Sequence, residues 1–97
     1  MNATQRRPRT TRLPRKVVPP VAGTSESDFE VYAAYRGSPS GGFYGTLAVV
    51  RTTDGRLLYP FEGAAEIGPF GSKLEAVDAA KRQGLAIIDG DLLRPEL

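Results

Sequence analysis

Apolar residues gather in three runs along the middle of the chain, at residues 29–36, 43–52 and 56–61, and each run is rich in Val, Tyr, Phe or Leu. Short apolar runs of β-branched and aromatic residues, bounded by turn signals, are typical of β-strands. The glycine- and serine-rich residues 37–42 separate the first two runs, and Asp54-Gly55 separates the last two. The pattern therefore predicts a three-stranded antiparallel β-meander.

The turn chemistry predicts how these strands pair. Asp-Gly is a preferred pair for a two-residue type I′ turn, in which both central residues need positive φ; this turn pairs Thr53 with Arg56. If the first loop pairs Arg36 with Phe43, one face of the sheet carries no charge. That face collects Phe29, Val31, Ala33, Tyr35, Tyr44, Ala48, Val50, Tyr59 and Phe61. We assign it to the core, but the register of the first hairpin stays open, because a shift of one residue moves a whole strand to the other face.

The opposite face of the predicted sheet is the candidate interaction surface, because aromatic side chains beside arginines can stack on bases or hold a partner. Its residues are Tyr32, Arg36, Phe43, Arg51 and Arg56. The apolar residues Phe43, Leu47, Val49 and Leu58 on this face also favour a weak homodimer or another protein contact. The alternative is a half-covered surface without a partner, since one helix can cover only one face of a sheet.

A helix is predicted to follow the sheet. Ser72 is its N-cap, and Glu75 completes a capping box. An apolar stripe at helical spacing contains Leu74, Val77, Ala80, Gly84, Ile87 and Ile88. Gly84 would let this helix approach the sheet closely, and Asp89-Gly90 would end it. The alternative is a helix that ends at Gly84, with a fourth strand at residues 85–88.

The fold class is therefore α+β: a three-stranded antiparallel meander packed against one C-terminal helix, in the order βββα. We place this domain at residues 28–91, before a short tail at 92–97. Residues 1–27 contain four prolines and few apolar residues, so we predict that they are disordered.

Charge divides the chain in the same place. The basic residues of the first segment are Arg6, Arg7, Arg9, Arg12, Arg15 and Lys16. The rest of the chain carries seven basic and eleven acidic residues, a net charge of −4, so the net charge of +2 arises from this arm. Such an arm can bind polyanions in a salt-sensitive, sequence-independent way; the alternative is a solvated tail.

Composition excludes several kinds of chemistry. The chain has no cysteine and no histidine, which excludes disulfides, thiolate metal sites and Ser-His-Asp or Cys-His catalysis. Asp89, Asp91 and Glu96 lack the spacing of a calcium loop, and we read them as a solvated helix end. No apolar run is long enough to span a bilayer, and the basic start of the sequence lacks the apolar core that a secretory signal requires. We expect a cytoplasmic protein that is not an enzyme, without membrane contact, cofactor or metal.

Two resemblances add to this reading. Residues 68–76, Gly-Pro-Phe-Gly-Ser-Lys-Leu-Glu-Ala, are similar to the G-x-F-x-T-x-x-E-A helix entry of plant AP2-type and phage-integrase arm-binding domains, with Ser72 in place of Thr. Residues 35–37 and 42–45 take part in the likeness. It implies a sheet presented to DNA and backed by a helix, with Arg36, Arg51 and Arg56 as the available strand arginines. Residues 28–91 as a whole resemble small bacterial proteins of unknown function found in β-proteobacteria such as Burkholderia.

The sequence thus predicts a small non-enzymatic binding module that uses the open sheet face and the basic arm. Its ligand is an unknown protein partner or a nucleic acid. The alternative function is an accessory nucleic-acid-binding protein that uses the sheet face and the arginine-rich arm.

Overall fold

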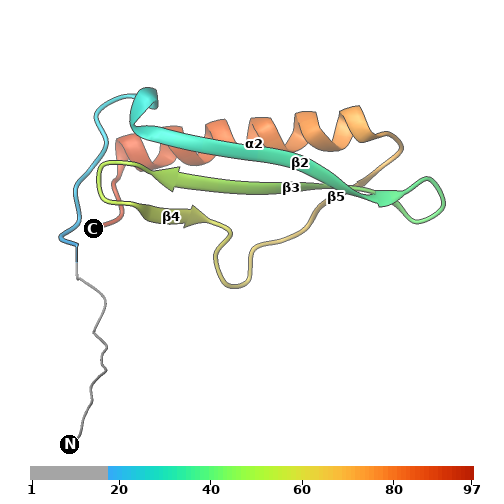
Figure 1. Ribbon diagram of the computed structural model, residues 1–97, viewed down its shortest axis with the longest axis horizontal. Coiled ribbons are helices and arrows are strands. Elements are labelled where there is room, and N and C mark those ends of the chain that lie inside the picture. Colours follow the sequence, from blue (N-terminus) through green and yellow to red (C-terminus); the bar gives the residue numbers. More distant parts are fainter. Residues whose placement is uncertain (1–17) are drawn as a thin grey trace, which may run out of the picture.

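The structure is a computed structural model that describes residues 18–97 (Figure 1). Its elements are η1 (Glu26–Asp28), β2 (Phe29–Ser38), β3 (Gly42–Arg51), β4 (Arg56–Tyr59), β5 (Ile67–Phe70) and α2 (Lys73–Leu93). The predicted fold class, an antiparallel sheet with one C-terminal helix, is confirmed. Most of the predicted arm lies outside the described residues. Its last part, residues 18–27, contacts the domain, where the Val21 N–H donates to Asp54 Oδ2 at 2.8 Å.

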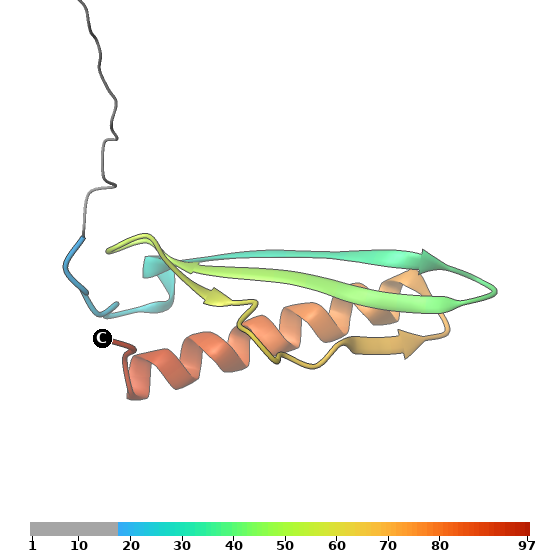
Figure 2. The ribbon, with the colours of Figure 1, turned by 90° about the horizontal axis from the view of Figure 1, so that it is seen from below.

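Strand β3 is the centre of the sheet. β2 pairs with it along one side, whereas β4 and β5 pair with opposite ends of its other side. Figure 2 shows α2 running lengthwise along one side of this sheet. The prediction missed β5, because Gly68-Pro69 within it is a turn signal. Proline is compatible with this strand because β5 lies at an edge, where an N–H facing away from the ladder is not needed.

The first hairpin is shifted by one residue from the predicted register. Arg36 opposes Tyr44 rather than Phe43, and the strands are joined through residues 39–41. Because side chains alternate with a period of two, this shift moves every β3 side chain to the other face. The face toward α2 therefore carries the odd-numbered residues of both strands. The predicted core assignment is right for β2 and wrong for β3.

The second hairpin also differs from the prediction. Arg51 opposes Arg56, so residues 52–55 form a longer turn than the predicted pairing of Thr53 with Arg56. Within the described residues, only glycines have positive φ, Gly55 among them at 74°, which excludes a type I′ turn. Asp54 stabilises this turn by accepting a hydrogen bond from the Arg56 N–H at 3.1 Å. The ladder shifts between Val49 and Val50, and both Leu58 and Tyr59 of β4 are buried.

Helix α2 begins where the sequence predicts. The Ser72 side chain accepts a hydrogen bond from the Glu75 N–H at 3.1 Å, as an N-cap should. The helix continues through Gly84, so the predicted continuous helix is correct and the alternative strand at 85–88 is wrong. It also passes the predicted end at Asp89-Gly90 and stops at Leu93.

The buried face of α2 consists of small residues near its start. Its buried residues are Ala76, Ala80, Gly84, Ile88 and Asp91. The predicted stripe is wrong at Leu74, which is 79% exposed. Close packing explains the difference: a Cβ on Gly45 of β3 would lie 2.6 Å from the Ala76 carbonyl oxygen. Only small residues fit where helix and strand approach this closely.

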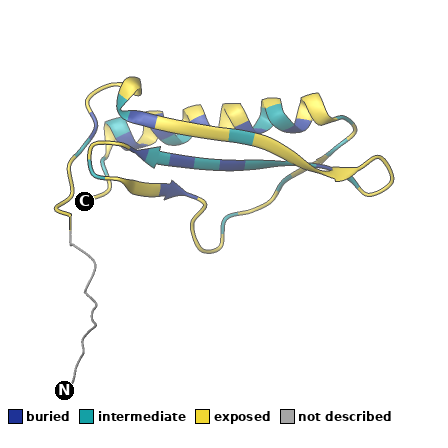
Figure 3. Ribbon diagram, viewed as in Figure 1, coloured by how far each residue is buried: buried dark blue, intermediate teal, exposed yellow. Residues whose placement is uncertain are grey.

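The core lies between α2 and the odd-numbered residues of β2 and β3, together with Leu58 and Tyr59 of β4. Figure 3 shows buried and intermediate residues alternating along β3, while most of β2 is exposed. The buried hydrophobic cluster contains Phe29, Leu47, Val49, Leu58, Tyr59, Ala80 and Ile88. Within residues 18–97, no helix is long and apolar enough to cross a membrane.

Candidate functional site

The predicted interaction surface is divided by the register shift. Tyr32 and Arg36 lie exposed on the face of the sheet opposite α2, as predicted. Phe43 and Arg51 do not: they are 5% and 0% exposed and belong to the face under the helix. Arg56 lies on the helix side as well, because it directly opposes Arg51 and pairs with Glu96. The patch predicted to favour a homodimer is likewise buried at Phe43, Leu47, Val49 and Leu58.

The arm residues predicted to bind polyanions lie outside the described residues. They are Arg6, Arg7, Arg9, Arg12, Arg15 and Lys16. Their role stays a prediction.

The exposed sheet face, which we call the open face, consists of even-numbered strand residues and Leu57. Its members are Glu30, Tyr32, Ala34, Arg36, Tyr44, Thr46, Ala48, Val50 and Leu57. Glu30, Val50 and Leu57 form one cross-strand row, and Tyr32 and Ala48 form the next. Tyr32 is 57% exposed and Leu57 is 54% exposed. The prediction missed Tyr44 and Leu57, and the correct first register would have placed Tyr44 here.

Three contacts hold the polar side chains of the open face. The Arg36 guanidinium lies 4.5 Å from the centroid of the Tyr44 ring, and its Nη2 donates to Glu66 Oε2 at 2.6 Å. The Tyr32 hydroxyl donates to Glu30 Oε1 at 2.6 Å, and this hydrogen bond raises the pKa of Tyr32. Both carboxylates therefore engage side chains of the face, and Arg36 is held between an aromatic ring and an acid.

A second polar group is buried at the other side of the sheet. Arg51, at the end of β3, donates from Nε and Nη2 to the two oxygens of Asp54, at 3.1 and 2.7 Å. Its Nη1 donates to Asp91 Oδ2 at 2.9 Å, and Nη2 also donates to the Glu96 carbonyl oxygen at 2.6 Å. The side chains of Arg51, Asp54 and Asp91 are at most 3% exposed. We call this group the Arg51 cluster.

The electrostatics of the Arg51 cluster follow from this geometry. The hydrogen bonds from Arg51 hold the pKa of Asp54 well below its usual range, against the opposing effect of burial. The hydrogen bonds to Asp54 in turn raise the pKa of Arg51. Arg51 and Asp54 are therefore both charged at neutral pH. An arginine that is always protonated and already shared between two carboxylates is a structural group rather than a general acid or base.

The cluster joins segments that are distant in sequence. It connects the β3–β4 turn, the end of α2 and the C-terminal tail, and Asp54 also accepts from Val21 of the N-terminal segment. The reading of Asp91 as a solvated helix end is therefore wrong. Its partner lies 40 residues away in sequence, and no local signal indicates the pair.

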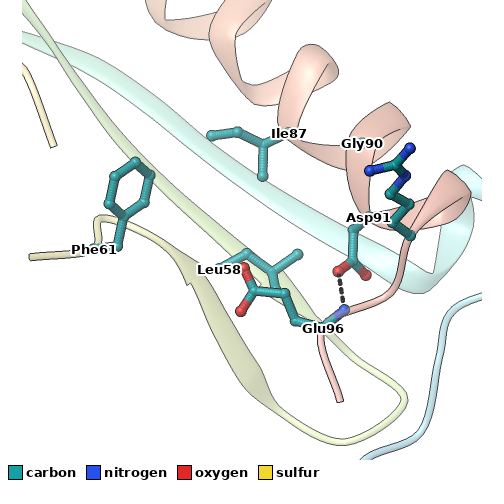
Figure 4. Close-up of a pocket in the computed structure, with 7 residues that line it drawn as sticks. Leu58, Phe61, Ile87, Gly90, Asp91 and Glu96 are labelled. Atoms are coloured by element: carbon teal, nitrogen blue, oxygen red, sulfur yellow. Dashed lines mark hydrogen bonds between the residues drawn. The ribbon is translucent and has the colours of Figure 1, made fainter.

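A hollow of about 240 Å³ opens beside the cluster, between β4 and the end of α2 (Figure 4). Leu58, Phe61 and Ile87 form its apolar wall, and Asp91, Arg94 and Glu96 border it. Asp91 Oδ1 accepts from the Glu96 N–H at 2.9 Å, so the carboxylate facing the hollow is already occupied. Within residues 18–97, no group of three or more His, Cys, Asp or Glu residues could hold a metal ion.

A family model matches residues 24–96, which is more than half of the chain. The chain belongs to the Family of unknown function (DUF6723). The DUF6723 match begins at Thr24, whose N–H and hydroxyl donate to Asp28, and it ends at Glu96, whose carbonyl completes the Arg51 cluster. The basic arm lies before the DUF6723 region. No curated protein and no solved structure matches the chain.

Proposed function

We propose that this DUF6723 protein is a small non-enzymatic binding module that holds a protein partner on its open face. The observation that supports the proposal best is the exposure of Tyr32 and Leu57, at 57% and 54%, on adjacent rows of a face that α2 does not cover. Exposed aromatic and aliphatic side chains that gather on one surface are typical of interaction sites.

The chemistry of the open face favours a protein over a polyanion. Its charged groups are Glu30 and Arg36 with the adjoining Glu66, two acids and one base. Residues 18–97 carry a net charge of −4, and four of their seven basic residues form ion pairs with acids. The Arg36 guanidinium also lies over the Tyr44 ring, so less side-chain entropy is lost on binding. Tyr and Arg are enriched among the residues that dominate protein–protein affinity.

A double variant tests this proposal. Tyr32→Ser with Leu57→Ser removes the two large, exposed apolar side chains of the open face, and Leu74→Ser is the matched control because Leu74 is 79% exposed on α2. Immobilised wild-type and variant chains are compared for the proteins they retain from an extract of source cells, and the affinity of each retained protein is then measured after purification. We expect binding about 30-fold weaker or more for the double variant, with no change for Leu74→Ser. Equal affinity for all three chains would overturn the proposal.

The second candidate function is accessory nucleic-acid binding by the arm. It is supported by the six basic residues of the arm, which has no acid among residues 1–16, and by the resemblance of residues 68–76 to DNA-binding domains. The test is a salt titration of binding to labelled duplex DNA and RNA, with and without residues 1–16. A steep salt dependence that disappears on deletion supports this function. Affinity that is unaffected by the deletion rules it out. Both proposals assume a cytoplasmic location and the bacterial origin that the resemblance of residues 28–91 implies.

A further inference from the structure

Strand β2 leaves one long edge of the sheet unpaired. It has ten residues, from Phe29 to Ser38, and it contains neither proline nor lysine, two of the devices that block edge-to-edge pairing. Its ladder partner is β3, and within residues 18–97 no segment pairs with its outer edge. An exposed strand of this length presents a row of backbone donors and acceptors to another strand.

The structure identifies which residues present these groups. The Thr52 N–H donates to the Asp28 carbonyl at 2.7 Å, and residues 28 and 52 continue the register in which Phe29 opposes Arg51. Hydrogen-bonded and non-hydrogen-bonded pairs alternate in an antiparallel ladder, so even-numbered β2 residues bond to β3. The odd-numbered residues therefore direct N–H and C=O outward: Phe29, Val31, Ala33, Tyr35 and Gly37.

The sequence of this edge is complementary to itself. If β2 pairs antiparallel with β2 of a second copy about Ala33, Glu30 opposes Arg36 of the other chain and Val31 opposes Tyr35. A closed two-fold pair keeps each side chain on its own face of the sheet, so opposing residues must both be even or both be odd. The register about Ala33 meets this condition and places opposite charges together on both sides of the axis.

The neighbouring symmetric registers are less favourable. A centre at Ala34 places Glu30 opposite Ser38. A centre at Tyr32 places Arg36 opposite Asp28, whose carboxylate already accepts three hydrogen bonds from Thr24 and Ser25, whereas Glu30 accepts one, from the Tyr32 hydroxyl. Charge complementarity therefore selects the register about Ala33.

The helix side of the same edge is incompletely covered. A hollow of about 370 Å³ lies there, lined by Val31, Ala33, Lys81 and Leu85. Val31, Tyr35 and Leu85 are 36%, 42% and 49% exposed. In the pairing about Ala33, both α2 helices lie on the same face of the joined sheet, so Val31 packs against Tyr35 of the other copy. The pairing would bury apolar surface together with the backbone edge.

We propose that the partner of the β2 edge is a second copy of this chain, paired antiparallel about Ala33 to form one continuous sheet across two subunits. The open faces of the two copies then join, with Tyr32 and Arg36 of both on one surface. In the single chain Arg36 pairs with Glu66, but both side chains are more than half exposed, at 53% and 65%, and such pairs exchange easily. This proposal does not depend on what the open face binds.

Charge reversal with rescue tests the proposal. Glu30→Arg places like charges opposite each other, and so does Arg36→Glu, whereas an equimolar mixture of the two single variants restores every opposite pair. Sedimentation equilibrium of the full chain up to about 1 mM should show a wild-type dimer, self-association about 10-fold weaker or more in each single variant, and dimers in the mixture. A monomeric wild type, unchanged association of the single variants, or a mixture that stays monomeric would each overturn it.

A backbone variant tests the edge itself. Ala33→Pro removes an outward N–H and leaves the β3 ladder intact, because Ala33 does not bond to β3. We expect an unchanged circular dichroism spectrum and a monomer. A dimer that persists in folded Ala33→Pro would show that the copies meet elsewhere. If proline at this position prevents folding through its fixed φ, the charge-reversal pair decides the proposal.

Discussion

Replacing Arg51 with methionine should destabilise the domain more than any other single arginine substitution among the described residues. The Arg51 side chain is fully buried, and its removal leaves Asp54 and Asp91 buried without a cation, each at most 3% exposed. Breaking a buried ion pair from one side costs about 3–5 kcal/mol. The cluster lies in a two-layer domain with little protein beyond it, so we take the lower end, about 3 kcal/mol. A domain of 80 described residues has a total stability of about 4–12 kcal/mol.

The matched control is Arg56→Met. Arg56 directly opposes Arg51 in the sheet, but its ion pair with Glu96 is 44% and 59% exposed. Exposed pairs contribute about 0–1 kcal/mol. Urea unfolding followed by circular dichroism at pH 7 gives both differences in the free energy of unfolding. A cost for Arg51→Met below about 1 kcal/mol, or no larger than the cost for Arg56→Met, would refute our account of the cluster.

The pH dependence of stability tests the Arg51 cluster independently, because the wild type and Arg51→Met should respond to acid in opposite directions. In the wild type the pKa of Asp54 is lower in the folded state than in the unfolded chain, so its stabilisation is present above about pH 4 and is lost as the pH falls further. In Arg51→Met, burial without a cation raises the pKa of Asp54, so the free energy of unfolding of this variant increases as the pH falls. The difference in the free energy of unfolding between the wild type and Arg51→Met should therefore become smaller from pH 7 to about pH 5. If Arg51→Met does not fold at pH 7, adding Asp54→Asn and Asp91→Asn should recover folding, since it removes the unpaired charges.

Three further substitutions test the packing and capping of α2. Gly45→Ala in β3 should lower the free energy of unfolding by about 1–3 kcal/mol, because the new Cβ would lie 2.6 Å from the Ala76 carbonyl oxygen of α2. Gly90→Ala in α2 should raise it by about 1 kcal/mol, because a Cβ there would have no atom within 4 Å. Urea titrations that give both changes the same sign would contradict this packing. Ser72→Ala should cost about 1 kcal/mol, since the Glu75 N–H loses its acceptor, and a thermal midpoint equal to that of the wild type would show that the cap contributes nothing.

Local signals predicted much of this fold. Ser72 and Glu75 marked the start of α2, and the fold class followed from three apolar runs before one helix. Register was harder, because residues 37–42 allow hairpins that differ by one residue, and the side-chain period of two turns that difference into a change of face. Phe43 and Arg51 were misplaced for this reason alone.

The remaining errors concern contacts between distant segments. A strand arginine is usually exposed, and nothing near Arg51 in sequence indicates that Asp91 lies beside it. The burial of Ala76 in place of Leu74 depends on Gly45 of β3, a residue in another element. The fold was thus predictable from local patterns. The composition of the open face required the strand register, and the Arg51 cluster required contacts between distant segments.

The central claim is that α2 covers the odd-numbered side of β3 and leaves the even-numbered side open. The chain has no cysteine, so single cysteines can report it directly. Ala48→Cys and Val49→Cys place a thiol at adjacent β3 positions, one partly exposed on the open face and the other fully buried. We predict that a thiol reagent modifies folded Ala48→Cys much faster than folded Val49→Cys, with equal rates in denaturant. Faster modification of Val49→Cys in the folded state would contradict the claim.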